Sequence, residues 1–234
     1  SGRMVISATA GLKPAWQHLL KEKAVPLSDQ PINKAGKSIL EITGKNINRN
    51  QLLEFARQNN FSPKAVYSWK DHHVIYSILS DIRATRKRAA NAFPGADIKV
   101  YEAPFYEFDR SRCPDKQEAK EWDEVIMTAN LVKEPALQQE YLHYHATQFT
   151  EWPEVAAGFC HAQFQQLQVF RNGRQLMLVI SLPKGKTLEE LNPKTTENNP
   201  RVDQWNRIMQ QYQEGIAGAA PGEVWVFLKP IDYL

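Results

Sequence analysis

One arrangement of apolar residues occurs twice along this 234-residue chain, and it limits the possible folds more than any other feature. Short runs of β-branched and aromatic residues predict strands, and runs with apolar residues three and four positions apart predict helices. In both halves of the chain the predicted order is strand, helix, strand, strand, helix, strand. The two units begin about 85 residues apart, which indicates an internal duplication of the fold rather than of residue identity.

The predicted elements can be given residue bounds. In the first unit, strands are expected at residues 38–42, 65–69, 74–79 and 98–108, with helices at 48–60 and 82–93. In the second unit, strands are expected at residues 125–131, 163–170, 175–182 and 224–228, with helical segments at 134–145, 152–159 and 202–214. Asn172-Gly173 joins two of these strands and is the strongest short signal of a β-hairpin.

A βαββαβ unit forms a four-stranded antiparallel sheet with both helices on one face. The other face must be covered, and two units in one chain can cover each other. The sequence therefore predicts an α+β protein with two tandem ferredoxin-like βαββαβ repeats that form a single-chain, pseudo-dimeric α+β barrel. Two independent ferredoxin-like domains are the alternative, and each of them would expose an apolar sheet face.

This pattern divides the chain into four parts. Residues 1–36 are expected to be an arm or linker with one short helix at 14–23, because prolines and a glycine interrupt a mixed polar sequence. Residues 37–110 form a degenerate first repeat, residues 111–122 a polar connector, and residues 123–234 the second repeat.

Net charge and the distribution of apolar residues limit the classes of partner that this chain could bind. A formal net charge of +3 is too small to indicate a nucleic-acid partner, and the basic run at residues 83–88 is typical of a solvated helix face. No apolar run is long enough to span a membrane, so no membrane partner is expected. The first four residues resemble a tag remnant, so an envelope location with an upstream signal or anchor stays open beside the slightly favoured cytoplasmic one. The assembly is expected to be a monomer or a homodimer.

Cysteines and histidines predict neither a disulfide framework nor a metal site. Two cysteines, Cys113 and Cys160, are expected to be unpaired thiols, with a single bridge as the alternative. His143 and His145 lie two positions apart on a predicted helix and point to different faces. Since glycine-rich phosphate loops are also absent from the sequence, no metal and no cofactor are expected.

The candidate chemistry lies in the second repeat. Tyr141 and His145 are four positions apart on one helix and share a face, and Trp205 lies on the second helix. Because both helices cover the same side of the sheet, these side chains are expected to converge in one pocket. An indole offers a flat apolar face to a sugar ring, and His and Tyr supply donors and acceptors for hydroxyls. The pattern favours a small neutral sugar, with a plain core packing pair as the alternative.

A specific resemblance follows from these residues. The segment EYLHYH at residues 140–145, followed by EWPE at residues 151–154, resembles the E-Y-x-x-x-H…W-P-E segment of the L-rhamnose mutarotase family. The likeness continues through the hairpin and the last strand and covers about residues 123–231. The family pairs two ferredoxin-like chains into a dimeric α+β barrel and interconverts the anomers of L-rhamnose.

The resemblance implies roles for three residues, and two further candidates lie near them. It implies that His145 is the proton donor and that Tyr141 and Trp205 bind the sugar. Asn206 stands where the family has a second Trp and is expected to contact the sugar. Glu154 is expected to contact the sugar as well, and it is a candidate for the second proton-transfer group. The implied function is an aldose mutarotase that acts on L-rhamnose or a related deoxy sugar, and such an isomerase uses no cofactor.

Two other functions stay open. Asn206 replaces the family's second Trp, and Leu167 stands near the position of a further family Tyr. These replacements favour, as the alternative, a non-catalytic carbohydrate-binding or regulatory module of the same fold. A small-molecule monooxygenase or haem-degrading protein is the third candidate, and it depends on fold analogy alone.

Overall fold

The computed structural model describes residues 36–231, and the helix that the sequence predicts at residues 14–23 lies outside them. Within the described residues, no helix is both long and apolar enough to cross a membrane.

The first half contains the four strands and two helices that the sequence predicts. Asn48 begins the first helix with a capping box to Gln51, and Asp81 begins the second by accepting from the Ala84 amide. Both helices pack against one core on the same face of the sheet, whose strand order is β4-β1-β3-β2. The elements are β1 (Ser38–Thr43), α1 (Arg49–Gln58), β2 (Val66–Trp69), β3 (His72–Ser77), α2 (Ile82–Ala92) and β4 (Asp97–Tyr101).

The second half repeats this order, with additional helical turns. Pro135 and Pro153 occupy first-turn positions, where the missing N–H costs no hydrogen bond. The first of these helices continues to Glu151, beyond the predicted end at residue 145. The elements are β6 (Trp122–Leu131), α3 (Pro135–Glu151), α4 (Pro153–His161), β7 (Gln166–Asn172), β8 (Gln175–Pro183), α5 (Leu188–Leu191), α6 (Pro200–Gln210), β9 (Gln213–Glu214) and β10 (Val226–Pro230). The main strand order is β10-β6-β8-β7.

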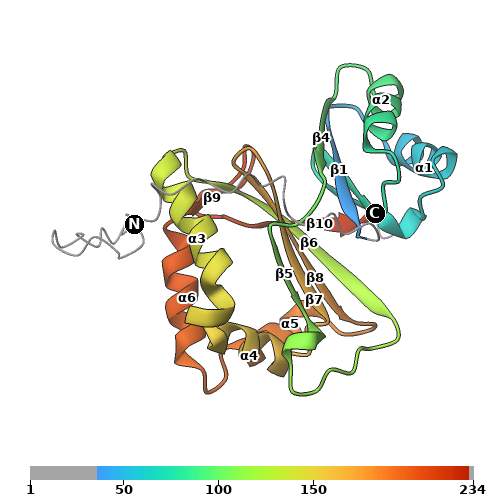
Figure 1. The fold of residues 1–234 in the computed structure, drawn as a ribbon. Coiled ribbons are helices and arrows are strands. Elements are labelled where there is room, and N and C mark those ends of the chain that lie inside the picture. Colours follow the sequence, from blue (N-terminus) through green and yellow to red (C-terminus); the bar gives the residue numbers. More distant parts are fainter. Residues whose placement is uncertain (1–35, 232–234) are drawn as a thin grey trace. The chain divides into compact units, whose positions relative to one another are not determined.

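The two halves belong to one continuous antiparallel sheet of ten strands (Figure 1). At one junction, β10 of the second half pairs with β2 of the first. At the other, the predicted strand at residues 98–108 is divided into β4, which pairs with β1, and β5 (Tyr106–Asp109), which pairs with β7. Since β4 and β5 stand at opposite ends of the strand order but follow each other along the chain, the sheet curls back on itself.

The inner face of this sheet is a core to which both halves contribute. The Tyr76 ring of β3 contacts the Phe170 ring of β7, with centroids 6.4 Å apart. The cluster is composed of Ile39, Tyr67, Val74, Tyr76, Tyr101, Ile126, Phe170, Met177, Val179 and Leu228. The fold is therefore the predicted single-chain α+β barrel. The described residues belong to one compact unit, so the repeat boundaries at residues 110 and 123 stay a prediction.

The expectation of two free thiols is wrong, because Cys113 and Cys160 form a disulfide. Cys113 follows a short 3-10 helix at the start of the connector, and Cys160 lies in the last turn of α4. The Arg110 guanidinium donates to the Cys160 carbonyl, at 3.2 Å, and so holds the connector against α4. This packing brings the two Cα atoms to 5.6 Å, although 47 positions separate them in sequence.

Candidate functional site

A pocket of about 400 Å³ lies between the helices and the sheet of the second half. It has a size that suits a small ligand. Helices α3 and α6 supply polar groups on one side, and strands β5 to β8 supply most of the apolar wall on the other. The lining residues whose side chains could bind a ligand or transfer a proton include Tyr106, Tyr141, His145, Gln148, Trp205 and Asn206.

The orientation of the His145 ring is set within α3. Its Nδ1 atom lies 3.0 Å from the main-chain oxygen of Tyr141, one turn earlier. A carbonyl oxygen can only accept, so Nδ1 carries the hydrogen and donates it. In the neutral ring the lone pair is then on Nε2. His145 therefore offers the pocket a proton acceptor and has no second N–H to donate.

The surroundings of His145 keep the ring neutral at ordinary pH. Only 8% of the residue is exposed, and its ring centroid lies 4.3 Å from that of Tyr141, 5.2 Å from Tyr106 and 5.3 Å from Trp205. Burial disfavours the charged form and lowers the pKa of His145 to about 4, although the Tyr141 carbonyl acts in the opposite direction. This neutral ring is better suited to be a general base than the proton donor that the resemblance implies.

Tyr141 is the proton donor that complements the acceptor of His145. Burial raises the pKa of its hydroxyl, so the phenol is neutral, while a hydrogen bond with the Gln213 side chain acts to lower that pKa. Because this hydrogen bond lowers the pKa, it favours the phenolate, which is the effect of an amide N–H that donates to the phenol oxygen. The Gln213 oxygen itself accepts from the Trp225 indole N–H at 3.2 Å. The Tyr141 hydroxyl therefore keeps its own proton available for a ligand.

Trp205 and Asn206 approach the same pocket from α6. Trp205 is only 5% exposed, and the rings of Tyr144 and Trp152 surround it, with centroids 5.9 and 5.7 Å away. These contacts hold the indole at the pocket wall. The structure thus brings together Tyr141, His145, Trp205 and Asn206, the four residues that the sequence places on the two long helices.

Glu154 is the candidate that the structure does not place in the pocket. It lies in the first turn of α4, where its Oε2 atom is 3.6 Å from Nε of Arg201. The main-chain oxygen of Glu154 accepts a hydrogen bond from the Asn199 side-chain amide. Glu154 therefore links α4 to the start of α6. Its proximity to the motif in sequence does not extend to the pocket, which α4 reaches instead with Phe159, near its other end.

Gln148 and Tyr106 are among the lining residues that were not predicted from the sequence. Gln148 lies one turn after His145 on α3, so helical spacing alone could have indicated it. Tyr106 lies on β5 and donates from its hydroxyl to the Gln148 side-chain oxygen. No local signal could have indicated Tyr106, because its place depends on the pairing of β5 with β7.

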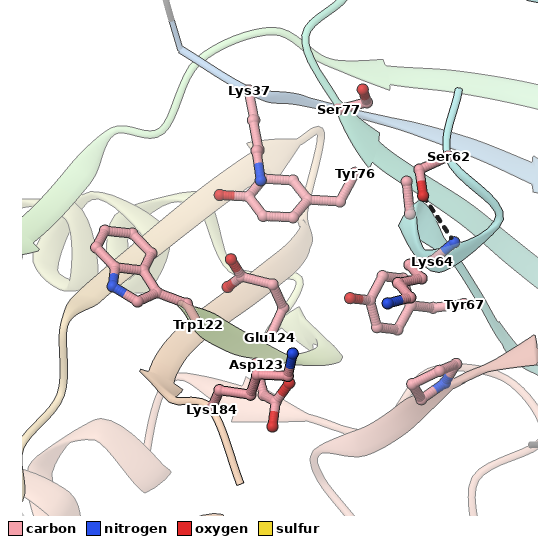
Figure 2. A pocket seen from close by; sticks show the side chains of 12 residues that line it. Lys37, Ser62, Lys64, Tyr67, Tyr76, Ser77, Trp122, Asp123, Glu124 and Lys184 are labelled. Atoms are coloured by element: carbon pink, nitrogen blue, oxygen red, sulfur yellow. Dashed lines mark hydrogen bonds between the residues drawn. The ribbon is translucent and has the colours of Figure 1, made fainter. Parts of the chain in front are cut away.

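A larger cavity, of about 580 Å³, lies at the junction of the two halves (Figure 2). Figure 2 shows the side chains of Lys37, Tyr76 and Glu124 facing the same space. Burial raises the pKa of Glu124, which accepts a hydrogen bond from Ser181. None of the residues that the sequence marks for chemistry lines this cavity, so it is not the candidate site. Across residues 36–231, no group of three His, Cys, Asp or Glu side chains is placed to hold a metal ion.

In sequence, known proteins match the half of the chain that contains the pocket. Residues 124–234 match the family model described as L-rhamnose mutarotase. An L-fucose mutarotase of Xanthomonas campestris pv. campestris is 29% identical over 101 residues, which cover 41% of this chain and 75% of that protein. A UPF0734 protein of Dictyostelium discoideum is 23% identical over 103 residues, covering 44% of this chain and 80% of that protein.

Two solved structures are similar over most of the chain. A monooxygenase-like protein of Listeria innocua has a TM-score of 0.44 and 12% identity, covering 84% of this chain and 95% of that one. A heme-degrading enzyme of Listeria monocytogenes has a TM-score of 0.38 and 10% identity, covering 82% of this chain and 98% of that one.

Proposed function

We propose that this chain, whose residues 124–234 are a domain of the L-rhamnose mutarotase family, interconverts the α and β anomers of a 6-deoxy aldose. L-Rhamnose and L-fucose are the leading substrates, since the family and a distant relative are named for them. The observation that carries the proposal is the meeting of a neutral imidazole, His145, with a phenol and an indole in one pocket.

The reaction needs two proton transfers. To open the ring, a base removes the proton of the anomeric hydroxyl while the bond between the anomeric carbon and the ring oxygen breaks. The ring oxygen receives a proton from an acid, and a free aldehyde results. After rotation about the adjacent carbon–carbon bond, the reverse transfers close the ring as either anomer. No electrons are gained or lost, so the side chains of the pocket suffice.

His145 and Tyr141 can perform these transfers as a pair. Nε2 of His145 accepts the anomeric proton, because Nδ1 is committed to the Tyr141 carbonyl. The Tyr141 hydroxyl donates to the ring oxygen, and the Gln213 amide stabilises the phenolate that forms. General acid–base help of this kind contributes about 10²–10⁴-fold in rate. When the ring closes, His145 returns its proton to the aldehyde oxygen and Tyr141 recovers its own.

The remaining contacts suit a monosaccharide. Trp205 presents an indole for the apolar face of the sugar, and the Asn206 amide can both donate to and accept from hydroxyls. The apolar wall, which includes Met127 and Leu178, suits the methyl group of a 6-deoxy sugar.

Saturation-transfer NMR tests this proposal, because it measures exchange between anomers directly. We expect the wild-type chain to accelerate exchange of L-rhamnose or L-fucose over buffer, with galactose as the comparison sugar that carries a 6-hydroxyl. His145→Gln should remove this acceleration. Failure of the wild-type chain to accelerate any of the three would contradict the activity. Sugar binding by calorimetry without any exchange would favour the non-catalytic carbohydrate-binding module instead.

A further inference from the structure

We propose that Tyr106, which lies outside the family domain, completes the sugar site by positioning Gln148 as a hydrogen-bond donor beside His145. This inference rests on the proposed function and extends it to a residue in the first half of the chain. It assigns Tyr106 a positioning role and Gln148 a role in substrate binding. The ligand group concerned is a hydroxyl oxygen next to the anomeric carbon.

Strand β5 brings Tyr106 to the pocket. Tyr106 pairs with Val169 of β7, and the amide of the preceding residue, Phe105, donates to the Val169 carbonyl at 2.9 Å. Because side chains alternate along a strand, this register points both Tyr106 and Phe108 toward the helices of the second half. Both belong to the same core as Tyr141 and Trp205. The family match begins only at residue 124, so this part of the wall comes from a different segment.

The contact between Tyr106 and Gln148 determines which way the Gln148 amide faces. The Tyr106 hydroxyl donates to the Gln148 Oε1 atom, and the two residues are only 4% and 1% exposed. With Oε1 held by the phenol, the two N–H groups of the amide point away from it. Gln148 lines the pocket, so these N–H groups lie beside the space that a ligand would occupy. A ligand oxygen that accepts from an amide oriented in this way adds a hydrogen bond at no cost of reorienting the side chain.

Gln148 supplies what His145 lacks. The only N–H of the neutral His145 ring is used by the Tyr141 carbonyl, so His145 accepts but does not donate. Gln148 lies one helical turn away on the same face of α3. The Tyr106 ring also meets the His145 ring edge to face, at 5.2 Å and 87°. A sugar whose anomeric hydroxyl donates to His145 Nε2 can therefore receive a hydrogen bond from Gln148 at the neighbouring hydroxyl.

Substitutions in the full chain test this arrangement. We expect Tyr106→Phe to raise KM and the sugar Kd about five- to tenfold with little change in kcat, because one orienting hydrogen bond is lost. Gln148→Leu should raise both at least as much. In the Gln148→Leu background, Tyr106→Phe should add nothing, because Tyr106 acts only through Gln148. For the 2-deoxy analogue of the sugar, wild type and Tyr106→Phe should bind equally, which a merely structural role would not produce.

The chain offers a matched control. Tyr76 also donates from its hydroxyl to a buried glutamine oxygen, that of Gln168, at 2.5 Å. This pair lies on β3 and β7 in the barrel interior, and Tyr76 lines the other cavity (Figure 2). Tyr76→Phe removes the same kind of hydrogen bond and should leave KM and Kd unchanged. An equal loss of sugar affinity in both variants would overturn the inference.

The outcomes separate the inference from the function on which it rests. If the wild-type chain exchanges anomers and Tyr106→Phe matches it in KM and Kd, the inference is wrong and the proposed function stands. If the wild-type chain neither binds nor exchanges any aldose, both are wrong. Should Tyr106→Phe fail to fold by circular dichroism, Gln148→Leu decides alone, and wild-type KM in that variant would overturn the inference.

Discussion

The Nδ1 atom of His145 donates to the main-chain oxygen of Tyr141, one turn earlier on α3, over 3.0 Å. This hydrogen bond assigns the ring hydrogen to Nδ1 and the lone pair to Nε2. It also holds the imidazole against the Tyr141 ring, so that a proton acceptor and a phenol stand side by side in the pocket. The proposed reaction and the pH behaviour of the protein both follow from this pair.

The first prediction concerns the pH dependence of anomer exchange. Because burial lowers the pKa of His145 to about 4, its neutral form is fully present near pH 7. The rate due to His145 should stay constant from neutral pH down to about pH 5 and fall as pH drops through 4. NMR exchange measurements across this range check the profile. His145→Gln should lower the plateau by about 10²–10⁴-fold and should show no such fall. A fall centred near pH 6.5 in the wild type would contradict the buried base.

The second prediction concerns stability rather than activity. An unfolded histidine has a pKa of about 6.5, so between that pH and about 4 the unfolded chain binds the proton that the folded chain does not. His145 should therefore not affect the free energy of unfolding above pH 6.5. As pH falls from 6.5 toward 4, the proton bound only by the unfolded chain should lower that free energy progressively. The loss at pH 4 should approach about 3 kcal/mol in the free energy of unfolding. Denaturant titrations at several pH values measure it. His145→Gln should flatten this part of the curve, and an equally steep curve in that variant would contradict the assignment.

The third prediction concerns Trp205. Truncation to alanine should weaken sugar binding about tenfold or more, because the indole face that stacks on the sugar is lost. Trp205→Phe should retain part of the affinity and the fold, since Tyr144 and Trp152 still have an aromatic neighbour. Calorimetry measures both. Trp122→Phe is the matched control, because Trp122 lines the other cavity. Unchanged affinity in both Trp205 variants would remove the indole from the site.

The fourth prediction concerns the disulfide between Cys113 and Cys160. It closes a loop of 47 positions that includes the connector, β6 and α3. Since such a cross-link reduces the conformational freedom of the unfolded chain, reduction should lower the free energy of unfolding by about 2–4 kcal/mol. Chemical denaturation with and without dithiothreitol checks this value. A Cys113→Ser/Cys160→Ser variant should match the reduced protein and should not respond to the reductant. A response in that variant would point to a different cause.

The fifth prediction concerns cooperativity between the two halves. Phe170 is fully buried in the core that both halves build, so Phe170→Ala should destabilise the protein by about 3–5 kcal/mol. Because this core is shared, hydrogen exchange should accelerate in β1 as well as in β8. Because the two halves of one chain build this core together, we also expect a folded monomer by light scattering. Acceleration confined to β8 would show that the halves unfold separately.

Local sequence patterns were sufficient to predict much of the fold and part of the candidate site. The period of two in strands and of 3.6 in helices depends on backbone geometry alone, so the repeated βαββαβ order could be read directly from apolar spacing. Helical spacing likewise placed Tyr141 and His145 on one face, and the shared sheet face placed Trp205 opposite them. These features depend on residues that are near one another in sequence, or on the rule that both helices of a βαββαβ unit cover the same face of its sheet.

Contacts between distant segments were decided only by the tertiary structure. The hydrogen bond from Tyr106 to Gln148 spans 42 positions, and the Cys113–Cys160 bridge spans 47. Neither has a local signature, because each depends on how β5 and the connector lie against α3 and α4. The depth at which His145 is buried also determines whether its imidazole is charged, and so whether it acts as a base or as a donor. The sequence determined which residues stand on which faces, and the packing of those faces determined their protonation and their partners, because burial and long-range pairing arise only when the segments meet.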